Sequence, residues 1–348
     1  MYNHTHLQEI SMIRVGMVGA TGYGGRELLR LLINHPQAEL VAASSTSAAG
    51  QSVADVLPAF QGLISVIFDG FDPKALAEQC DVVFIGVPGT QSMDTAAALR
   101  AAGVRVIDMG PDFRLLDLEE FKTYYKTDHT QPDLLKDRVY GMVPLYRNAL
   151  KNADLVAVPG CYPLSVIIPL RPLLETMNTD IPVIVDSISG ISGAGKSLNQ
   201  NFHFPEMNEN VRAYELGTHQ HTPEMEQELD RKVQIQFSPH VGPFTRGILS
   251  TITVRPKNDI DIDAVYSVYN DEPYVRVLGK DNIPDLNQVH GTNFCDFGWV
   301  KDERTGNLII VSAIDNLVGG TAGMAIQCMN LMFDLDETTG LRLGGMSI

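Results

Sequence analysis

The chain has 348 residues, 44% of them hydrophobic, and a formal net charge of −16 from 26 Lys and Arg against 42 Asp and Glu. Such an acidic chain is poorly suited to nucleic acid or to an anionic membrane surface, so we predict neither partner. Its length predicts two domains. The sequence holds no run of about 18 apolar residues, so no transmembrane helix is expected.

The four cysteines, Cys80, Cys161, Cys295 and Cys328, lie far apart and form no CxxC motif. This spacing is typical of free thiols in a reducing compartment, so we predict a cytoplasmic protein. Residues 1–11 contain two histidines and no apolar core. They do not resemble a secretory signal, and we expect the fold to begin near Met12.

Apolar runs at 13–18, 40–43, 82–87, 104–108 and 155–158 predict strands, and the stretches 26–33 and 90–102 predict helices between them. Alternating strands and helices are typical of a parallel, doubly wound sheet. The first part of the chain is therefore predicted to be an α/β domain of the Rossmann type, spanning residues 12–160.

After residue 160 the pattern becomes richer in strands, which are predicted at 183–189, 233–237, 248–254, 275–278, 294–300 and 308–313. Helices are predicted at 164–174, 223–229 and 262–269. We expect an α+β catalytic and dimerisation domain with a mixed sheet over residues 161–320. A final apolar helix, within 321–335, is expected to pack back on the first domain.

A glycine-rich turn joins the first predicted strand to the first predicted helix. Its candidate cofactor-binding residues are Gly19, Thr21, Gly22, Tyr23, Gly24 and Gly25. Glycines between a strand and a helix let the backbone approach a pyrophosphate at the helix N-terminus. An ordinary turn is the alternative, but this context favours a dinucleotide site.

The end of the second predicted strand bears on the choice between NAD and NADP. A carboxylate at this point would bind the ribose 2′-hydroxyl of NAD. The chain instead has Ser44, Ser45 and Thr46, which carry hydroxyls and do not repel a 2′-phosphate. We predict NADP as the cofactor, with NAD as the alternative.

Cys161 follows a predicted strand and Gly160, and Pro163 suits a first helical turn. Free N–H groups and the dipole at a helix start favour a thiolate, so we expect a thiol pKa lowered from about 8.5 to about 6.5. The alternative is a small buried apolar side chain, which fits the other three cysteines better. Cys161 is the predicted nucleophile.

Two histidines two residues apart, His219 and His221, precede a predicted helix, with Glu224 able to orient a ring. This pattern indicates a general acid or base at one of the histidines. A zinc site is a weaker alternative because no further cysteine or histidine cluster completes it, and we predict no metal. A capping or surface role for both histidines also stays open.

Three segments carry a cation beside glycine or a turn, at Arg114, Lys196 and Arg246. Arg and Lys on such turns can bind carboxylate or phosphate, so these residues are candidates for an anionic substrate. We further predict Tyr162, beside the cysteine, as a substrate-binding residue. Gly193 and Asn316 are predicted to contact the cofactor.

Taken together, the segments GATGYGG, DMGPDFRL, PGCYP, SGISGAG, HQHTPE and SPHVGPFTRGIL resemble the N-acetyl-gamma-glutamyl-phosphate reductase family of arginine biosynthesis, which is related to aspartate-semialdehyde dehydrogenase. The resemblance runs from Ile13 to about Phe333. It implies that Cys161 accepts the acyl group, that the HQH segment supplies the acid/base histidine, and that the glycine turn with Ser44 and Ser45 forms the NADP site.

The chain departs from the family pattern at three places. Val158 stands where asparagine is usual, the turn at 140–144 lacks a nearby acidic residue, and Gly319 replaces a common lysine. The loss of the lysine affects a cofactor or substrate contact, and the core of the thiol chemistry is retained.

The predicted activity is NADPH-dependent reduction of N-acetyl-gamma-glutamyl phosphate through a thioester on Cys161, by a homodimer or homotetramer. One alternative is the aminoadipyl-phosphate analogue of lysine biosynthesis, whose extra methylene changes binding by about 1–3 kcal/mol. A non-catalytic NADP-binding sensor is the other.

Overall fold

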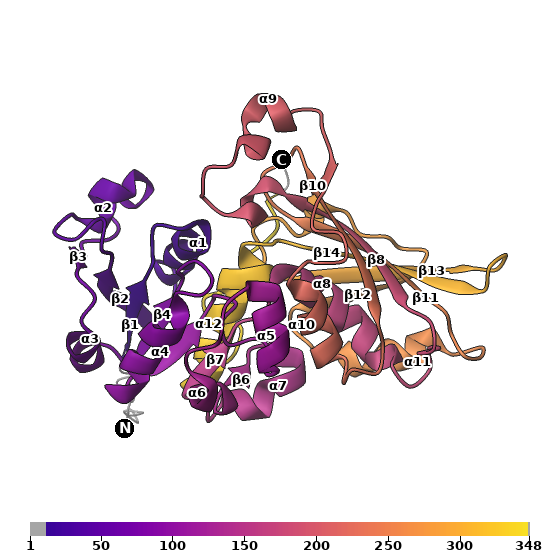
Figure 1. Ribbon diagram of the computed structural model, residues 1–348, viewed down its shortest axis with the longest axis horizontal. Coiled ribbons are helices and arrows are strands. Elements are labelled where there is room, and N and C mark those ends of the chain that lie inside the picture. The colour runs from indigo at the N-terminus through magenta and orange to yellow at the C-terminus, as the bar shows by residue number, and fades with distance from the viewer. Residues whose placement is uncertain (1–11, 347–348) are drawn as a thin grey trace, which may run out of the picture.

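The computed structural model describes residues 12–346, so the predicted N-terminal extension lies outside the described residues. The first half of the chain forms a seven-stranded sheet in the order β3-β2-β1-β4-β5-β7-β6 (Figure 1). Every pairing in it is parallel. Its strands are β1 (Ile13–Val18), β2 (Ala38–Ser44), β3 (Phe68–Asp69), β4 (Val82–Ile85), β5 (Arg105–Asp108), β6 (Val139–Tyr140) and β7 (Leu155–Ala157).

Helices connect these parallel strands. They are α1 (Tyr23–Leu32), α2 (Val53–Val56), α3 (Pro73–Gln79), α4 (Ser92–Ala101), α5 (Leu118–Tyr125), α6 (Pro132–Lys136) and α7 (Val143–Leu150). The strand order runs outward in both directions from the β1–β4 pair. In such sheets ligands bind at the carboxyl ends of the strands where the order reverses. The end of β1, which carries the glycine turn, lies at that point.

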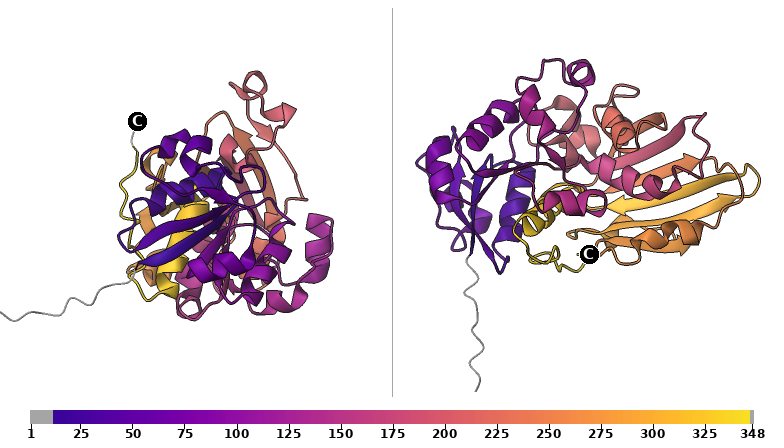
Figure 2. Two further views of the ribbon diagram at one scale, coloured as in Figure 1. Left: turned by 90° about the vertical axis from the view of Figure 1, so that its left-hand side faces the viewer. Right: turned by 90° about the horizontal axis from the view of Figure 1, so that it is seen from below.

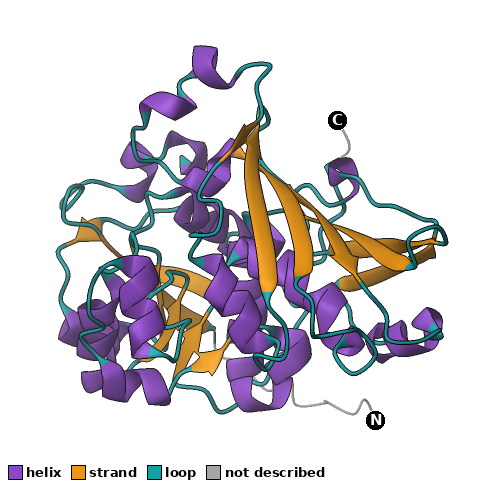
Figure 3. Ribbon diagram, turned by 45° about the vertical axis from the view of Figure 1, so that its right-hand side comes forward, coloured by secondary structure: helices purple, strands orange, loops and turns teal. Residues whose placement is uncertain are grey.

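The second half forms a mixed seven-stranded sheet in the order β12-β13-β14-β11-β8-β10-β9 (Figure 3). The β8–β10 and β12–β13 pairs are parallel, and the other four are antiparallel. Its strands are β8 (Val183–Gly190), β9 (Arg212–Ala213), β10 (Ile235–Gly242), β11 (Ile248–Val254), β12 (Val275–Lys280), β13 (Cys295–Asp302) and β14 (Asn307–Ile314). The two sheets confirm the predicted fold class.

The helices of the second half are α8 (Cys161–Leu170), α9 (Phe204–Met207), α10 (His221–Glu228), α11 (Ile262–Tyr266) and α12 (Gly323–Met332). α8 packs on β11, β13 and β14, and α10 packs on α8 and β10. Burial alternates along β8, β10 and β11, so one face of the sheet is covered and the other is partly exposed. Half-exposed apolar side chains, such as Ile188 and Leu249, lie on the second face.

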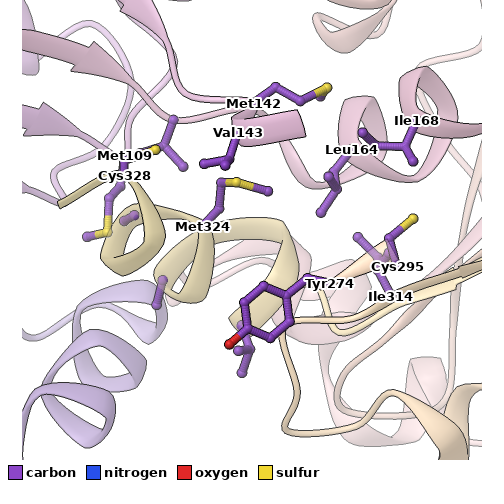
Figure 4. Close-up of a cluster of buried hydrophobic side chains, with 14 of the residues drawn as sticks. Met109, Met142, Val143, Leu164, Ile168, Tyr274, Cys295, Ile314, Met324 and Cys328 are labelled. Atoms are coloured by element: carbon purple, nitrogen blue, oxygen red, sulfur yellow. The ribbon is translucent and has the colours of Figure 1, made fainter. Parts of the chain in front are cut away.

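The last helix, α12, returns to the first half of the chain, where it contacts α1, α7 and β5 (Figure 2). All ten of its residues are buried. Figure 4 shows Met324 of this helix pointing towards Val143 of α7, in the same apolar cluster as Leu164 and Ile314. One continuous core therefore joins the two sheets, and α12 lies between them.

Several elements were not predicted from the sequence. β3, β6 and β9 have two residues each, which is too short for a periodic apolar pattern. Of the eight residues of α5, Phe121 alone is fully buried, so its apolar stripe is weak. Over residues 12–346 the structure has no helix with both the length and the apolar character needed to span a membrane.

Candidate active site

A cavity of about 760 Å³ lies between the two sheets and is lined by both halves of the chain. The first half contributes Gly89, Thr90, Pro111, Arg114, Tyr124 and Tyr125. The polar and aromatic side chains from the second half include Cys161, Tyr162, Arg212, Tyr214, His219 and His221. A concave site where a thiol, imidazoles and guanidinium groups converge is the best candidate for catalysis in the described part of the chain.

Cys161 is the first residue of α8 and is partly exposed to this cavity. Two glycines make close packing around it possible. A Cβ on Gly160 would lie 2.5 Å from Nε2 of His221, and a Cβ on Gly320 would lie 2.7 Å from Cβ of Cys161. A larger residue at either position would push an imidazole or the 320 segment away from the thiol.

A buried network of hydrogen bonds and an ion pair fixes the segment before the cysteine. Glu224 accepts hydrogen bonds from the N–H of Gly160 at 2.8 Å and from the Tyr140 hydroxyl at 2.7 Å. Nη1 of Arg114 lies 3.5 Å from the Glu224 carboxylate and 3.2 Å from Nε2 of His221. Glu224 is therefore connected to the His221 ring through Arg114.

The backbone sets the tautomer of His219. Its Nδ1 accepts a hydrogen bond from the N–H of His221 at 3.1 Å, so the neutral ring carries its proton on Nε2. The ring packs edge-on against Tyr162, Tyr214 and Phe237. Burial lowers the pKa of His219 to about 4 and lowers the pKa of His221 as well, so both rings are neutral near pH 7.

The glycine turn packs closely against neighbouring backbone. Gly19 has φ +89°, and a Cβ on it would lie 2.5 Å from the carbonyl oxygen of Gly86. A Cβ on Gly25 would lie 2.8 Å from Ala20, and Gly22 caps α1 without a side chain. The first N–H groups of α1 are therefore available to phosphate oxygens, and these residues fit a dinucleotide.

The glycine turn with the start of α1, here called the dinucleotide cradle, lies next to the cavity. Gly24 of the turn is close to Thr321, whose Cγ2 would lie 3.2 Å from a Cβ at that position, and Thr321 also lines the cavity. A dinucleotide whose pyrophosphate is bound at α1 can thus extend towards Cys161. β2 ends at Ser44, which is buried, and Ser45 follows it. Positions 44–46 hold no carboxylate.

Comparison with known proteins agrees with this geometry. A family model described as "Semialdehyde dehydrogenase, NAD binding domain" matches residues 14–153, and "Semialdehyde dehydrogenase, dimerisation domain" matches residues 161–316. N-acetyl-gamma-glutamyl-phosphate reductase of Symbiobacterium thermophilum is 46% identical over 343 residues, which cover 96% of this chain and 98% of the relative. The chain belongs to the N-acetyl-gamma-glutamyl-phosphate reductase family.

A second relative of the same name, from Magnetococcus marinus, is 45% identical over 338 residues, which cover 94% of this chain and 97% of the relative. Among solved structures, aspartate semialdehyde dehydrogenase II from Vibrio cholerae has a TM-score of 0.71 at 16% identity, covering 93% of this chain and 99% of that one. The enzyme from Candida albicans, solved with NADP, has a TM-score of 0.69 at 17% identity, with the same two coverages. These structures support the fold.

The cysteine environment differs from our expectation. Burial raises the pKa of Cys161 to about 11, although the positive charge of Arg114 and the N–H groups at the start of α8 act in the opposite direction. The predicted lowering to about 6.5 is therefore wrong for the protein without substrate. Desolvation of the thiolate outweighs the helix start because α8 begins inside the protein.

This raised pKa gives a testable pH dependence. Only the thiolate reacts with iodoacetamide, so alkylation of Cys161 in the free protein should rise about tenfold per pH unit between pH 7 and 9. An ordinary thiol with a pKa of about 8.5 would level off within that range. The measurement is the alkylation rate of the Cys161 peptide by mass spectrometry. Levelling off below pH 9 would contradict the raised pKa.

Three of the predicted substrate- and cofactor-binding residues line the cavity. Tyr162 lines it and shares a hydrogen bond of 2.9 Å between its hydroxyl and that of Tyr214. Arg114 also lines it but is largely occupied, because it donates to the carbonyl oxygens of Val158 and Met109. Gly193 is part of the lining, next to Ser189.

The structure does not bring three other predicted residues to the cavity. Nε of Arg246 lies 2.8 Å from the Asp315 carboxylate and its Nη2 lies 3.4 Å from that of Glu27, so its charge is already balanced. Lys196 is exposed outside the lining. Asn316 instead accepts a hydrogen bond from the N–H of Gly247 and donates one to Ser192, so it holds two loops together.

The sequence analysis missed several lining residues, among them Arg212 and Tyr125. Arg212 lies on β9 and pairs with Val241 of β10, which places its guanidinium at the cavity. No glycine turn or motif marks either residue.

Two of the departures from the family pattern lie beside the site. The carbonyl oxygen of Val158 accepts a hydrogen bond from Arg114, and the Val158 side chain is buried in the core. Tyr140, from the unusual turn, binds Glu224.

Proposed function

We propose that the protein catalyses the NADPH-dependent reduction of N-acetyl-gamma-glutamyl phosphate to N-acetyl-glutamate 5-semialdehyde and phosphate, as a step of arginine biosynthesis. The relatives that share 40–46% of its sequence carry the name of this activity. The observation that carries the mechanism is the position of Cys161, at a helix start in a cavity between a dinucleotide cradle and two imidazoles.

In the first step, Sγ of Cys161 attacks the acyl carbon. A C–S bond forms, the bond from carbon to the phosphate oxygen breaks, and phosphate leaves with the bonding electron pair and the thiol proton. Because the thiol is protonated in the free protein, the proton must leave as the C–S bond forms. The neighbouring imidazoles and the Arg114 guanidinium stabilise the resulting charges.

NADPH, when bound, supplies a hydride to the carbonyl carbon of the thioester. His219 then donates its Nε2 proton to the oxygen of the thiohemiacetal and takes it back as the C–S bond breaks. The bonding electron pair stays on Sγ, which takes up one proton from solvent to restore the thiol, and the aldehyde leaves. The backbone hydrogen bond to Nδ1 keeps the proton on Nε2 before each cycle. We assign His221 a positioning role, because its Nε2 is bonded to Arg114.

The cavity also supplies cations for the anionic substrate. Arg114 lies beside Gly160 and Cys161, so we propose that it faces the acyl phosphate group. Arg212 lines the cavity from β9, in the second half of the chain, and is proposed to bind the substrate carboxylate. Lys196 and Arg246 are not part of this proposal, since neither lines the cavity.

The test is turnover by the purified protein with N-acetyl-gamma-glutamyl phosphate and NADPH. Phosphate release and NADPH oxidation should occur in a ratio of one to one. Binding of NADP without turnover would support the sensor alternative and contradict the proposal. A higher kcat/KM with the aminoadipyl analogue, which is one methylene longer, would move the substrate to the alternative.

We propose that the enzyme acts as a homodimer in the cytoplasm, with residues 12–160 and 161–320 as its two domains and 321–335 packing back on the first. The partly exposed face of the second sheet carries half-buried apolar side chains, including Ile188, Leu249 and Val311, and suits a second copy. Light scattering after gel filtration should give the dimer mass. A tetramer would need a second contact surface, and a monomer at micromolar concentration would contradict the dimer.

A further inference from the structure

Tyr125 is the last residue of α5, and its ring has a fixed position. The ring stacks on that of Phe121, with centroids 4.7 Å apart and an interplanar angle of 27°. Asp117 caps the start of α5, and Lys126, with φ +60°, ends it. Tyr125 lines the catalytic cavity together with Arg114 and Cys161.

The hydroxyl of Tyr125 is buried, yet it has no hydrogen-bond partner among residues 12–346. Such hydroxyls are uncommon in folded proteins, because burying an unpaired donor costs stability. Phenylalanine at this position would keep the ring and its stacking without that cost. The unpaired hydroxyl therefore points to a partner that enters the cavity.

The charged groups near this hydroxyl are already engaged with the rest of the protein. Asp112 accepts from the N–H groups of Thr90 and Ser92, and Asp108 accepts from Gly110. Glu224 accepts from Gly160 and from Tyr140 through Oε1, while its Oε2 has no hydrogen bond among the described residues and is ion-paired with Nη1 of Arg114 at 3.5 Å.

Arg114, the neighbouring cation, donates to two backbone carbonyls and to His221. Burial keeps the pKa of the Tyr125 hydroxyl well above its usual value, so the group is a protonated donor near pH 7. The chemistry left to it is donation to an oxygen of a bound molecule.

We propose that Tyr125 is a substrate-binding residue whose hydroxyl donates a hydrogen bond to an oxygen of the acyl phosphate group. This inference rests on the proposed function. The acceptor is a carbonyl or phosphoryl oxygen, both of which carry lone pairs and gain negative charge as the C–S bond forms. A donor fixed before substrate binds stabilises that charge without reorganisation of the site.

The test is the Tyr125→Phe variant, which removes the hydroxyl and keeps the ring. Loss of one hydrogen bond to a charged acceptor should lower kcat/KM about 10- to 100-fold. The melting temperature should stay the same or rise, because an unpaired buried donor is removed. A stable variant with wild-type kcat/KM would overturn the inference.

A matched control is Tyr266→Phe. The Tyr266 hydroxyl is also buried, but it donates to the carbonyl oxygen of Pro169 at 2.9 Å, away from the cavity. This variant should lose stability and keep its kcat/KM, the opposite of Tyr125→Phe. If kcat/KM falls as much in Tyr266→Phe as in Tyr125→Phe, the loss is structural and the proposal is wrong.

The reverse reaction, run with the semialdehyde, NADP and inorganic phosphate, identifies the acceptor. A raised KM for phosphate with an unchanged KM for the aldehyde would assign the contact to the phosphoryl oxygen. A lower kcat in both directions with an unchanged KM for phosphate would assign it to the carbonyl oxygen. Absence of turnover in the wild-type protein would instead refute the proposed function, independently of Tyr125.

Discussion

Replacing Cys161 by serine is expected to lower kcat by at least about 10⁴-fold, the order that loss of the nucleophile costs in other enzymes with covalent intermediates. A serine hydroxyl is a much weaker acid than a thiol. The site already raises the pKa of the thiol to about 11 by burial, so an alkoxide would be still less accessible. The measurement is steady-state NADPH oxidation with saturating acyl phosphate.

Cys80→Ser is the matched control for that substitution. Cys80 is a buried free thiol at the end of α3, packed against Gly16, and does not line the cavity. This variant should retain the wild-type kcat. Acid quenching of the wild-type enzyme with acyl phosphate in the absence of NADPH should leave an acyl group on the Cys161 peptide. Near-normal turnover by Cys161→Ser would refute the thioester.

Long apolar runs made the fold largely predictable. The strands β1 and β11 have the predicted bounds, and the buried helices α8 and α12 were expected within a few residues. Their side chains face the core along most of their length, so periodicity alone marks them. α5 was missed because its ends are set by the Asp117 cap and the left-handed Lys126, which a search for apolar periodicity does not detect.

The candidate site was predictable where neighbouring residues along the chain carry the chemistry. Cys161 and the histidine pair were found because a strand, a glycine and a helix start adjoin them in sequence. Arg246 was misleading, because the carboxylates of Glu27 and Asp315, which are distant in sequence, balance its charge. The raised pKa of Cys161 was also unpredictable, since burial depends on how the whole chain packs around α8.

The separation of roles within the histidine pair follows from two hydrogen bonds. The bond from the His221 N–H to Nδ1 of His219 leaves the Nε2 proton of His219 for transfer. The Arg114 guanidinium engages Nε2 of His221 and connects it to Glu224 and Gly160. One ring is therefore prepared to exchange a proton, and the other holds the start of α8 in place. The two rings should respond differently to substitution.

His219→Gln is expected to lower steady-state kcat by about 10²–10⁴-fold, the usual contribution of a general acid or base. Glutamine can keep a hydrogen bond to the His221 N–H, but it cannot donate and recover a proton at the position of Nε2. The first step does not use that proton, so one equivalent of phosphate should still be released rapidly. Rapid-quench measurement of phosphate, beside NADPH oxidation, separates the two steps.

The initial phosphate burst distinguishes this variant from Cys161→Ser, which should show neither burst nor turnover. His203→Gln is the control, because His203 is exposed and lies outside the cavity lining. If His219→Gln kept the wild-type kcat while His221→Gln lost it and retained the burst, the proton would be transferred by His221. The bond from Arg114 to its Nε2 would then have to break during each turnover, which would make Arg114 part of the proton transfer.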